Sequence, residues 1–192
     1  MRYGTPSIES QVLELSRLPN IDEILLVPLY PHYAESTIAT TIAETERVLK
    51  KHALSIKLKT LKPFYDRPEY IEALVSSAQP WISKPESYDH VLFSYHGLPE
   101  QHITGTDPTG NHCLKQENCC SVSSSAHETC YRHQVFKTTE CFVKETGLKQ
   151  EQYTIAFQSR LGRARWLEPS TNDTLIELAN AGVKNLLVLC PA

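Results

Sequence analysis

Long apolar runs are missing from this sequence of 192 residues. The longest are as short as Ile24 to Val27, whereas a membrane-spanning helix needs about 18 apolar residues. The first six residues lack the apolar core of a secretory signal. A net charge of −3 argues against general binding to nucleic acid. These absences predict a soluble, cytoplasmic chain with no nucleic-acid partner.

Phosphate-binding loops are missing as well. Neither a G-x-G-x-x-G nor a Walker pattern occurs, so no nucleotide cofactor is expected. The composition, with 41% hydrophobic and 21% charged residues, is that of a globular protein. The length suits one domain, or one large domain that carries an inserted segment.

The pattern alternates helix and strand, and the strands are mostly apolar rather than strictly alternating. Such an order predicts an α/β fold with mostly parallel sheets covered by helices. A polar, cysteine-rich segment at about 107–130 is too long for an ordinary connection. We expect helices at 5–18, 36–51, 68–83, 131–145 and 172–181, and strands at 22–29, 54–61, 90–95, 153–158 and 185–189.

His96 follows an apolar strand and precedes Gly97 and Pro99, which favour a sharp turn. Ligands of parallel sheets collect at the carboxyl ends of the strands. An imidazole there could exchange protons near neutral pH. The competing interpretation is a structural histidine that bonds a loop carbonyl.

Two other loops follow buried strands. Trp166 lies beside a basic stretch that would suit a planar, acidic ligand or would form a solvated loop. The stretch from Tyr30 to Tyr33 could wall an apolar pocket or cap the core. The arginines of the first loop are Arg160, Arg163 and Arg165.

Four of the six cysteines fall in one short segment. Six in the whole chain are too few for a disulfide scaffold, so a clustered set favours metal. Four thiolates can complete a tetrahedral zinc site or ligate a [2Fe–2S] cluster. The spacing is not that of common zinc ribbons, and flanking histidines (His112, His127 and His133) could replace a thiolate. The four cysteines are Cys113, Cys119, Cys120 and Cys130.

Several blocks resemble the ferrochelatase family, whose members insert iron into a porphyrin. The strings FSYHGLPE at Phe93 to Glu100 and FQSRLGRARWLEPSTND at Phe157 to Asp173 carry most of the resemblance. MRYGTP at Met1 to Pro6, PLYPHYAEST at Pro28 to Thr37 and DPTGNHC at Asp107 to Cys113 add to it. The blocks are ordered as in the family and cover nearly the whole chain.

The resemblance implies a fold of two similar halves with a porphyrin cleft between them. Residues 1–88 would be the remainder of an incomplete first half, and residues 89–192 the second half with its cysteine-rich insert. The chain looks truncated at both ends, and no residue matches the family's C-terminal catalytic glutamate. Activity of such a fragment is therefore an open question.

The resemblance also implies roles for single residues. His96 matches the histidine that accepts pyrrole protons or binds the metal, and Arg2 and Tyr3 match positions at the metal-entry side. Tyr33 and Trp166 match positions that line the cleft. The four clustered cysteines resemble those of bacterial members with an internal [2Fe–2S] cluster.

The expected partners are therefore a porphyrin and ferrous iron, the iron as substrate. Protoporphyrin and coproporphyrin remain open as the tetrapyrrole, as do the oligomeric state and a transient membrane association. Rival interpretations are a non-catalytic porphyrin-binding fragment, an iron–sulfur or zinc sensor, and a chelatase for cobalt or nickel.

Overall fold

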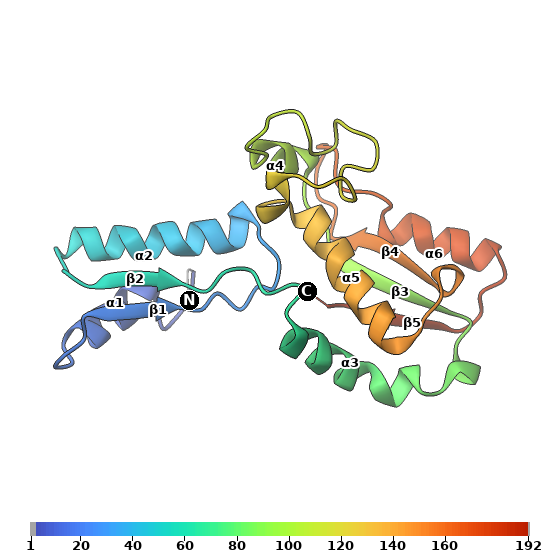
Figure 1. The fold of residues 1–192 in the computed structure, drawn as a ribbon, viewed down its shortest axis with the longest axis horizontal. Helices are drawn as coiled ribbons and strands as arrows, with labels where there is room; N and C mark the ends of the chain where they lie inside the picture. The colour runs from blue at the N-terminus through green and yellow to red at the C-terminus, as the bar shows by residue number, and fades with distance from the viewer. Residues whose placement is uncertain (1–2, 192) are drawn as a thin grey trace. The chain divides into compact units, whose positions relative to one another are not determined.

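The computed structural model describes residues 3–191 and divides into two compact units, residues 1–63 and 64–192 (Figure 1). Each unit holds a parallel sheet flanked by helices, which confirms the expected fold class. The division lies before the helix at 68–82 because that helix packs on a later one of the second unit. Halves at 1–88 and 89–192 concern the complete family fold and stay a prediction.

The first unit is built on two parallel strands and two helices. Strand β1 pairs with β2 from Glu23 opposite Lys57 to Leu26 opposite Thr60. Its core consists of Val12, Val48 and Leu49, with partly buried aliphatic side chains around them. The elements are α1 (Ile8–Ser16), β1 (Glu23–Leu26), η1 (Glu35–Ala39), α2 (Thr40–Lys51) and β2 (Lys57–Thr60).

The helix expected at 36–51 begins with a π-helical turn. In η1 the Ala39 amide bonds the Ala34 carbonyl five residues earlier, at 3.4 Å. Threonine hydroxyls compete for the backbone carbonyls here: Thr37 Oγ1 donates to the same Ala34 oxygen at 3.3 Å, and Thr41 Oγ1 donates to Thr37 O at 2.7 Å. Side chains that bond back to the preceding turn in this way distort a helix, and the periodicity of apolar residues does not reveal it.

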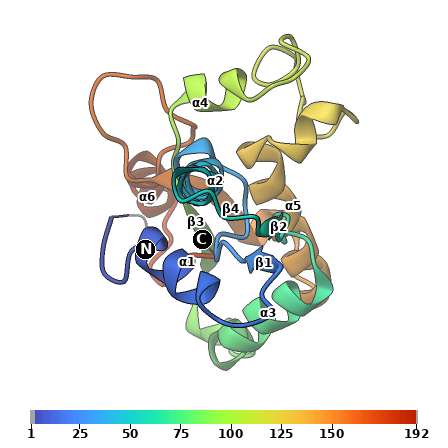
Figure 2. The same cartoon turned by 90° about the vertical axis from the view of Figure 1, so that its left-hand side faces the viewer.

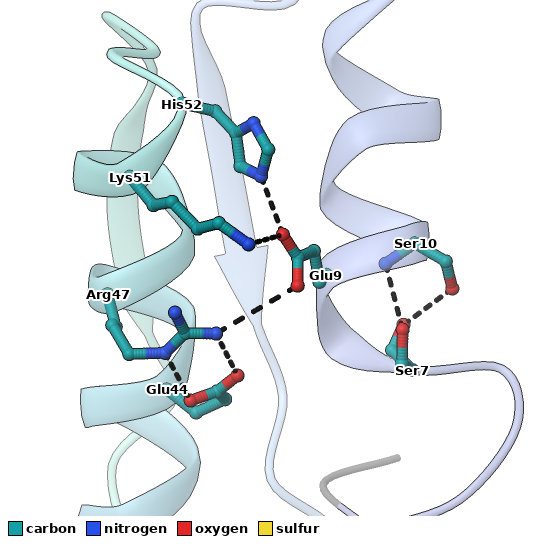
Figure 3. Close-up of polar contacts among 7 residues, drawn as sticks. All are labelled: Ser7, Glu9, Ser10, Glu44, Arg47, Lys51 and His52. Carbon is teal, nitrogen blue, oxygen red and sulfur yellow. Dashed lines mark hydrogen bonds and ion pairs between the residues drawn. The ribbon is translucent and has the colours of Figure 1, made fainter.

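Helices α1 and α2 are joined by charge at their surface (Figure 3). The Glu9 carboxylate accepts from Lys51 Nζ at 2.7 Å and faces His52 Nε2 at 2.6 Å. Arg47 lies 3.9 Å from Glu9 and is itself paired with Glu44 at 2.8 Å. The hydrogen bonds from Lys51 and His52 lower the pKa of Glu9 to about 2.

We expect Glu9→Gln to make the free energy of unfolding of the first unit less dependent on pH under acidic conditions. A carboxylate whose pKa is lower in the folded than in the unfolded chain stabilises the fold above pH ~4.5. That contribution disappears as the pH falls from about 4.5 to about 2. Chemical denaturation at several pH values, followed in this range, would measure it. If Glu9→Gln loses as much stability as the unmodified chain over this pH range, Glu9 is not the responsible group. Glu14→Gln, on the same helix, is the control.

The second unit has a three-stranded parallel sheet in the order β4-β3-β5. Strand β3 is central, and its residues 91–95 are buried. Phe93 packs edge-on against Phe142 of α5, while Ser94, which points to the other face, bonds Thr171 of α6 at 2.9 Å. Figure 2 likewise places α5 and α6 on opposite sides of these strands. The sheet is therefore covered on both faces, as a parallel sheet requires.

The expected helices and strands of this unit are present, with ends that differ by two residues or fewer. Helix α4 was not expected, and it follows the turn after His96. No helix within residues 3–191 is long and apolar enough to cross a membrane. The elements are α3 (Pro68–Ile82), η2 (Pro85–Ser87), β3 (His90–His96), α4 (Glu100–Gly105), η3 (Ser125–Glu128), α5 (Tyr131–Thr146), η4 (Gln150–Gln152), β4 (Tyr153–Gln158), α6 (Thr171–Asn180) and β5 (Leu186–Leu189).

Candidate active site and cysteine-rich segment

His96 is the last residue of β3 and is exposed, in contrast to the five buried residues before it. It lies opposite Gln158 at the carboxyl end of the adjacent strand β4. The Tyr131 hydroxyl donates to the His96 carbonyl oxygen at 2.7 Å. A rigid, buried strand thus presents one imidazole to the ligand end of the sheet.

Gly97 lets two loops meet beside this histidine. Its amide donates to the Gln158 carbonyl at 2.7 Å. A Cβ atom at this position would lie 2.7 Å from the same oxygen and 3.3 Å from the Trp166 ring. Only glycine fits without a shift of the β4 backbone. Trp166 is therefore brought next to the turn that follows His96.

The Trp166 loop is tied to the His96 turn by backbone pairing. Leu167 N donates to Leu98 O at 3.0 Å, and Pro99 forms an antiparallel bridge with Trp166. The indole Nε1 donates to Leu161 O at 3.0 Å, within its own loop. The three loop arginines are exposed, and Arg165 reaches Glu100 at 3.5 Å. At such exposure this ion pair contributes little stability.

The remaining expected site residues belong to the first unit. Tyr3 is 89% exposed and Tyr33 is half-buried, whereas Arg2 lies outside the described residues. His32, in the same loop as Tyr33, is buried, and burial lowers its pKa to about 3. The loop after β1 therefore buries the imidazole of His32 while Tyr30 stays 46% exposed.

Asp107 anchors the start of the cysteine-rich segment. One carboxylate oxygen accepts from the amides of His112 and Cys113, each at 2.8 Å. The other accepts from the Thr109 amide at 2.9 Å and its hydroxyl at 2.7 Å. Although burial opposes it, the bonds from Cys113 and Thr109 lower the pKa of Asp107. The DPTG string is a turn signal that could have indicated this role.

The thiols of the segment lie together and are mostly buried. Cys113, Cys119 and Cys130 are at most 4% exposed. A hydrogen bond from the Cys120 thiol, supported by the Cys113 thiol and the nearby His127, lowers the pKa of Cys130 to about 6. Burial and the charge of Cys130 raise the pKa of Cys113 to about 12. Contacts with neighbouring thiols therefore lower the pKa of Cys130 and raise that of Cys113.

Arg132 supplies positive charge to this group. Its Nη1 lies 3.5 Å from Cys120 Sγ and 3.9 Å from Cys119 Sγ, and its guanidinium stacks over the Phe136 ring at 4.8 Å. A guanidinium against sulfur offsets the negative charge of thiolates. Nothing in the sequence spacing pointed to this residue.

The three histidines of the segment face carbonyl oxygens. His112 and His127 both contact Cys119 O, at 2.6 and 2.9 Å, and His133 contacts Cys120 O at 2.7 Å. The rings of His127 and His133 stack with centroids 3.6 Å apart. These ring nitrogens therefore support the backbone of the cysteine pair.

No group of three or more His, Cys, Asp or Glu side chains that could hold a metal ion is found among residues 3–191. The thiol contacts described above are pairwise, from Cys130 to Cys120 and to Cys113. The expected [2Fe–2S] cluster is therefore not confirmed and stays a prediction.

Comparison with known proteins decides the family. A family model described as ferrochelatase matches residues 1–192. The chain belongs to the ferrochelatase family. Ferrochelatases of Stutzerimonas stutzeri A1501 and Pseudomonas fluorescens Pf0-1 are each 51% identical to it over 193 residues. The ferrochelatase of Pseudomonas aeruginosa LESB58 is 47% identical over 192 residues.

These ferrochelatases match the whole of this chain, but the chain spans only 56% of their length. The sequence resemblance is thereby confirmed for the family. The roles expected for His96, Trp166, Tyr33 and Tyr3 are not tested by these matches and stay predictions.

Proposed function

We propose that this chain carries the part of a ferrochelatase that accepts porphyrin protons while ferrous iron enters the ring. The observation that supports it most is the placement of His96. The imidazole is exposed at the end of the central strand, beside the Trp166 loop, in a chain that belongs to the ferrochelatase family.

The chemistry follows from the substrate. A free porphyrin carries two N–H groups inside a flat ring, and both protons must leave when the cation enters. A neutral imidazole is a suitable acceptor at neutral pH. Trp166 and Tyr33 offer flat apolar faces to the macrocycle. Of the two residues expected at the metal-entry side, Tyr3 offers a phenol oxygen, a donor that releases Fe²⁺ more readily than a thiolate does.

The two tryptophans of the chain allow a sharp test of binding. Trp81 is 60% exposed on α3, far along the sequence from the Trp166 loop. We expect protoporphyrin IX or coproporphyrin III to quench the fluorescence of Trp81→Phe, in which only Trp166 remains. The matched variant Trp166→Phe should bind more weakly and should lose the quenching.

The same samples, mixed anaerobically with Fe²⁺, should form metalloporphyrin, seen as a change in the visible absorption bands. Binding without insertion would favour the non-catalytic porphyrin-binding fragment. Absence of both binding and insertion would contradict the proposal for this chain. A comparison of the two porphyrins identifies the preferred substrate.

We also infer that Cys113, Cys119, Cys120 and Cys130 take up a [2Fe–2S] cluster. The contacts of the Cys130 thiol with those of Cys120 and Cys113, with Arg132 as counter-charge, support this. A bound cluster would supply one-electron chemistry and would cross-link the segment. Thiolate-to-iron absorption bands in the anaerobically purified chain are expected. A colourless chain that contains zinc would favour the zinc interpretation instead.

A further inference from the structure

Two consecutive residues, Cys130 and Tyr131, connect the cysteine-rich segment to the candidate base His96. Cys130, whose thiol contacts those of Cys120 and Cys113, is the N-cap of α5. Tyr131, the next residue, donates its hydroxyl to the His96 carbonyl at 2.7 Å. Tyr131 is only 6% exposed, and this hydrogen bond is partly buried. One peptide unit therefore separates a thiol of the cysteine group from a direct contact to His96.

The base of the segment is clamped on both sides of this point. The Thr129 hydroxyl donates to Thr106 O at 2.7 Å, and the Thr106 hydroxyl donates to Thr129 O at 3.4 Å. Gln134, fully buried, donates to the carbonyls of His127 and Glu128 at 3.1 and 3.0 Å. Because the backbone is fixed on both sides of Cys130, we expect a displacement of Cys130 to move Tyr131 as well.

The rest of α5 is fixed by the core. Phe142 packs on Phe93 with ring centroids 5.3 Å apart, and the Thr139 hydroxyl bonds Tyr95 Oη at 2.9 Å. These contacts hold the middle of the helix on β3. The first turn is the part that joins the cysteine segment, on one side, to the end of β3, on the other.

We propose that Tyr131 is a positioning residue that couples the placement of Cys130, at the start of α5, to the placement of His96 at the end of β3. An effect of this coupling on iron insertion rests on the proposed function, in which His96 accepts the porphyrin protons. The reason is geometric: His96 ends its strand, and beyond it only the Gly97 amide continues the pairing with β4. The Tyr131 hydroxyl holds the carbonyl at this last position, and the imidazole extends from the same residue.

The test uses the eight histidines of the chain and does not require turnover. Imidazole ring signals of the ¹³C-histidine-labelled, reduced chain are recorded by NMR at one fixed pH. His96→Gln assigns the His96 signal and His90→Gln assigns that of His90. His90 begins the same strand and bonds Thr154 at 2.9 Å, so it reports on the integrity of the sheet.

We expect Tyr131→Phe to shift or split the His96 signal and to leave the His90 signal unchanged. Cys130→Ser should move the His96 signal in the same direction. The double variant should move it no further than the larger single change, because both act through one link. Cys141→Ser, farther along α5, should have no effect on His96.

Two results would overturn the proposal: a His96 signal that Tyr131→Phe leaves in place, or changes from Cys130→Ser and Tyr131→Phe that simply add. If Cys130→Ser also disturbs His90, Cys130→Ala takes its place. These outcomes are independent of the porphyrin assays. A chain that shows the coupling but inserts no iron would retain this inference and lose the proposed function.

Discussion

Replacement of His96 by alanine is expected to slow iron insertion by roughly 10²- to 10⁴-fold, the range over which a general base acts. Porphyrin binding should change little, because the flat faces that would hold the ring belong to other residues. The side chain is exposed, so its truncation leaves the sheet intact. Metalloporphyrin formation under anaerobic conditions measures the rate, and tryptophan quenching measures binding.

His90→Ala is the matched control, since it removes an imidazole from the other end of the same strand. It should retain the insertion rate. Equal losses in His90→Ala and His96→Ala would mean that both act through the stability of β3. An unchanged rate in His96→Ala would remove the histidine from the reaction, and the proton acceptor would then have to be another group.

Much of the fold could be predicted from periodicity alone. The strand expected at 153–158 and the helix at 131–145 are found with nearly the same ends, and the buried residues of α5 recur at helical spacing although half of them are polar. Helix α4 escaped this reasoning. Its six residues bury only Ile103, too few for a helical repeat to emerge from the sequence.

The π-helical turn of η1 escaped for a different reason. Threonine hydroxyls that bond backbone carbonyls, such as Thr41 to Thr37, are local contacts that apolar spacing does not encode. The sequence pattern predicted a helix there and could not indicate its hydrogen-bond register.

In the candidate site, too, the placement of some residues could be predicted from the sequence and that of others could not. His96 could be predicted, because a polar residue at the end of a buried strand is visible in one stretch of sequence. Arg132 and Tyr131 could not, because their partners are 12 and 35 residues away in the sequence. From the sequence, the flanking histidines could replace a thiolate as metal ligands. They contact carbonyl oxygens of the cysteine pair instead, which only tertiary structure reveals.

Asp107→Ala is expected to open the cysteine-rich segment while the sheet stays folded. The substitution removes the acceptor of four hydrogen bonds, two of them from the amides of His112 and Cys113, which lie in buried residues. Buried amides left without a partner are costly, so we expect the reaction of Cys113 and Cys119 with a disulfide reagent to accelerate by about tenfold or more. Proteolysis should move to residues 107–130.

The variant Asp107→Asn distinguishes the contributions of the two carboxylate oxygens of Asp107. An asparagine can keep the acceptor that faces Thr109, but its NH₂ group cannot accept from the His112 and Cys113 amides. If the second oxygen anchors the segment, Asp107→Asn should resemble Asp107→Ala in thiol reactivity. Thr109→Ala, which loses only the hydroxyl contact, should stay near the unmodified chain. Thiols that remain protected in Asp107→Ala would mean that the Thr106–Thr129 clamp and the histidine contacts suffice to hold the segment closed.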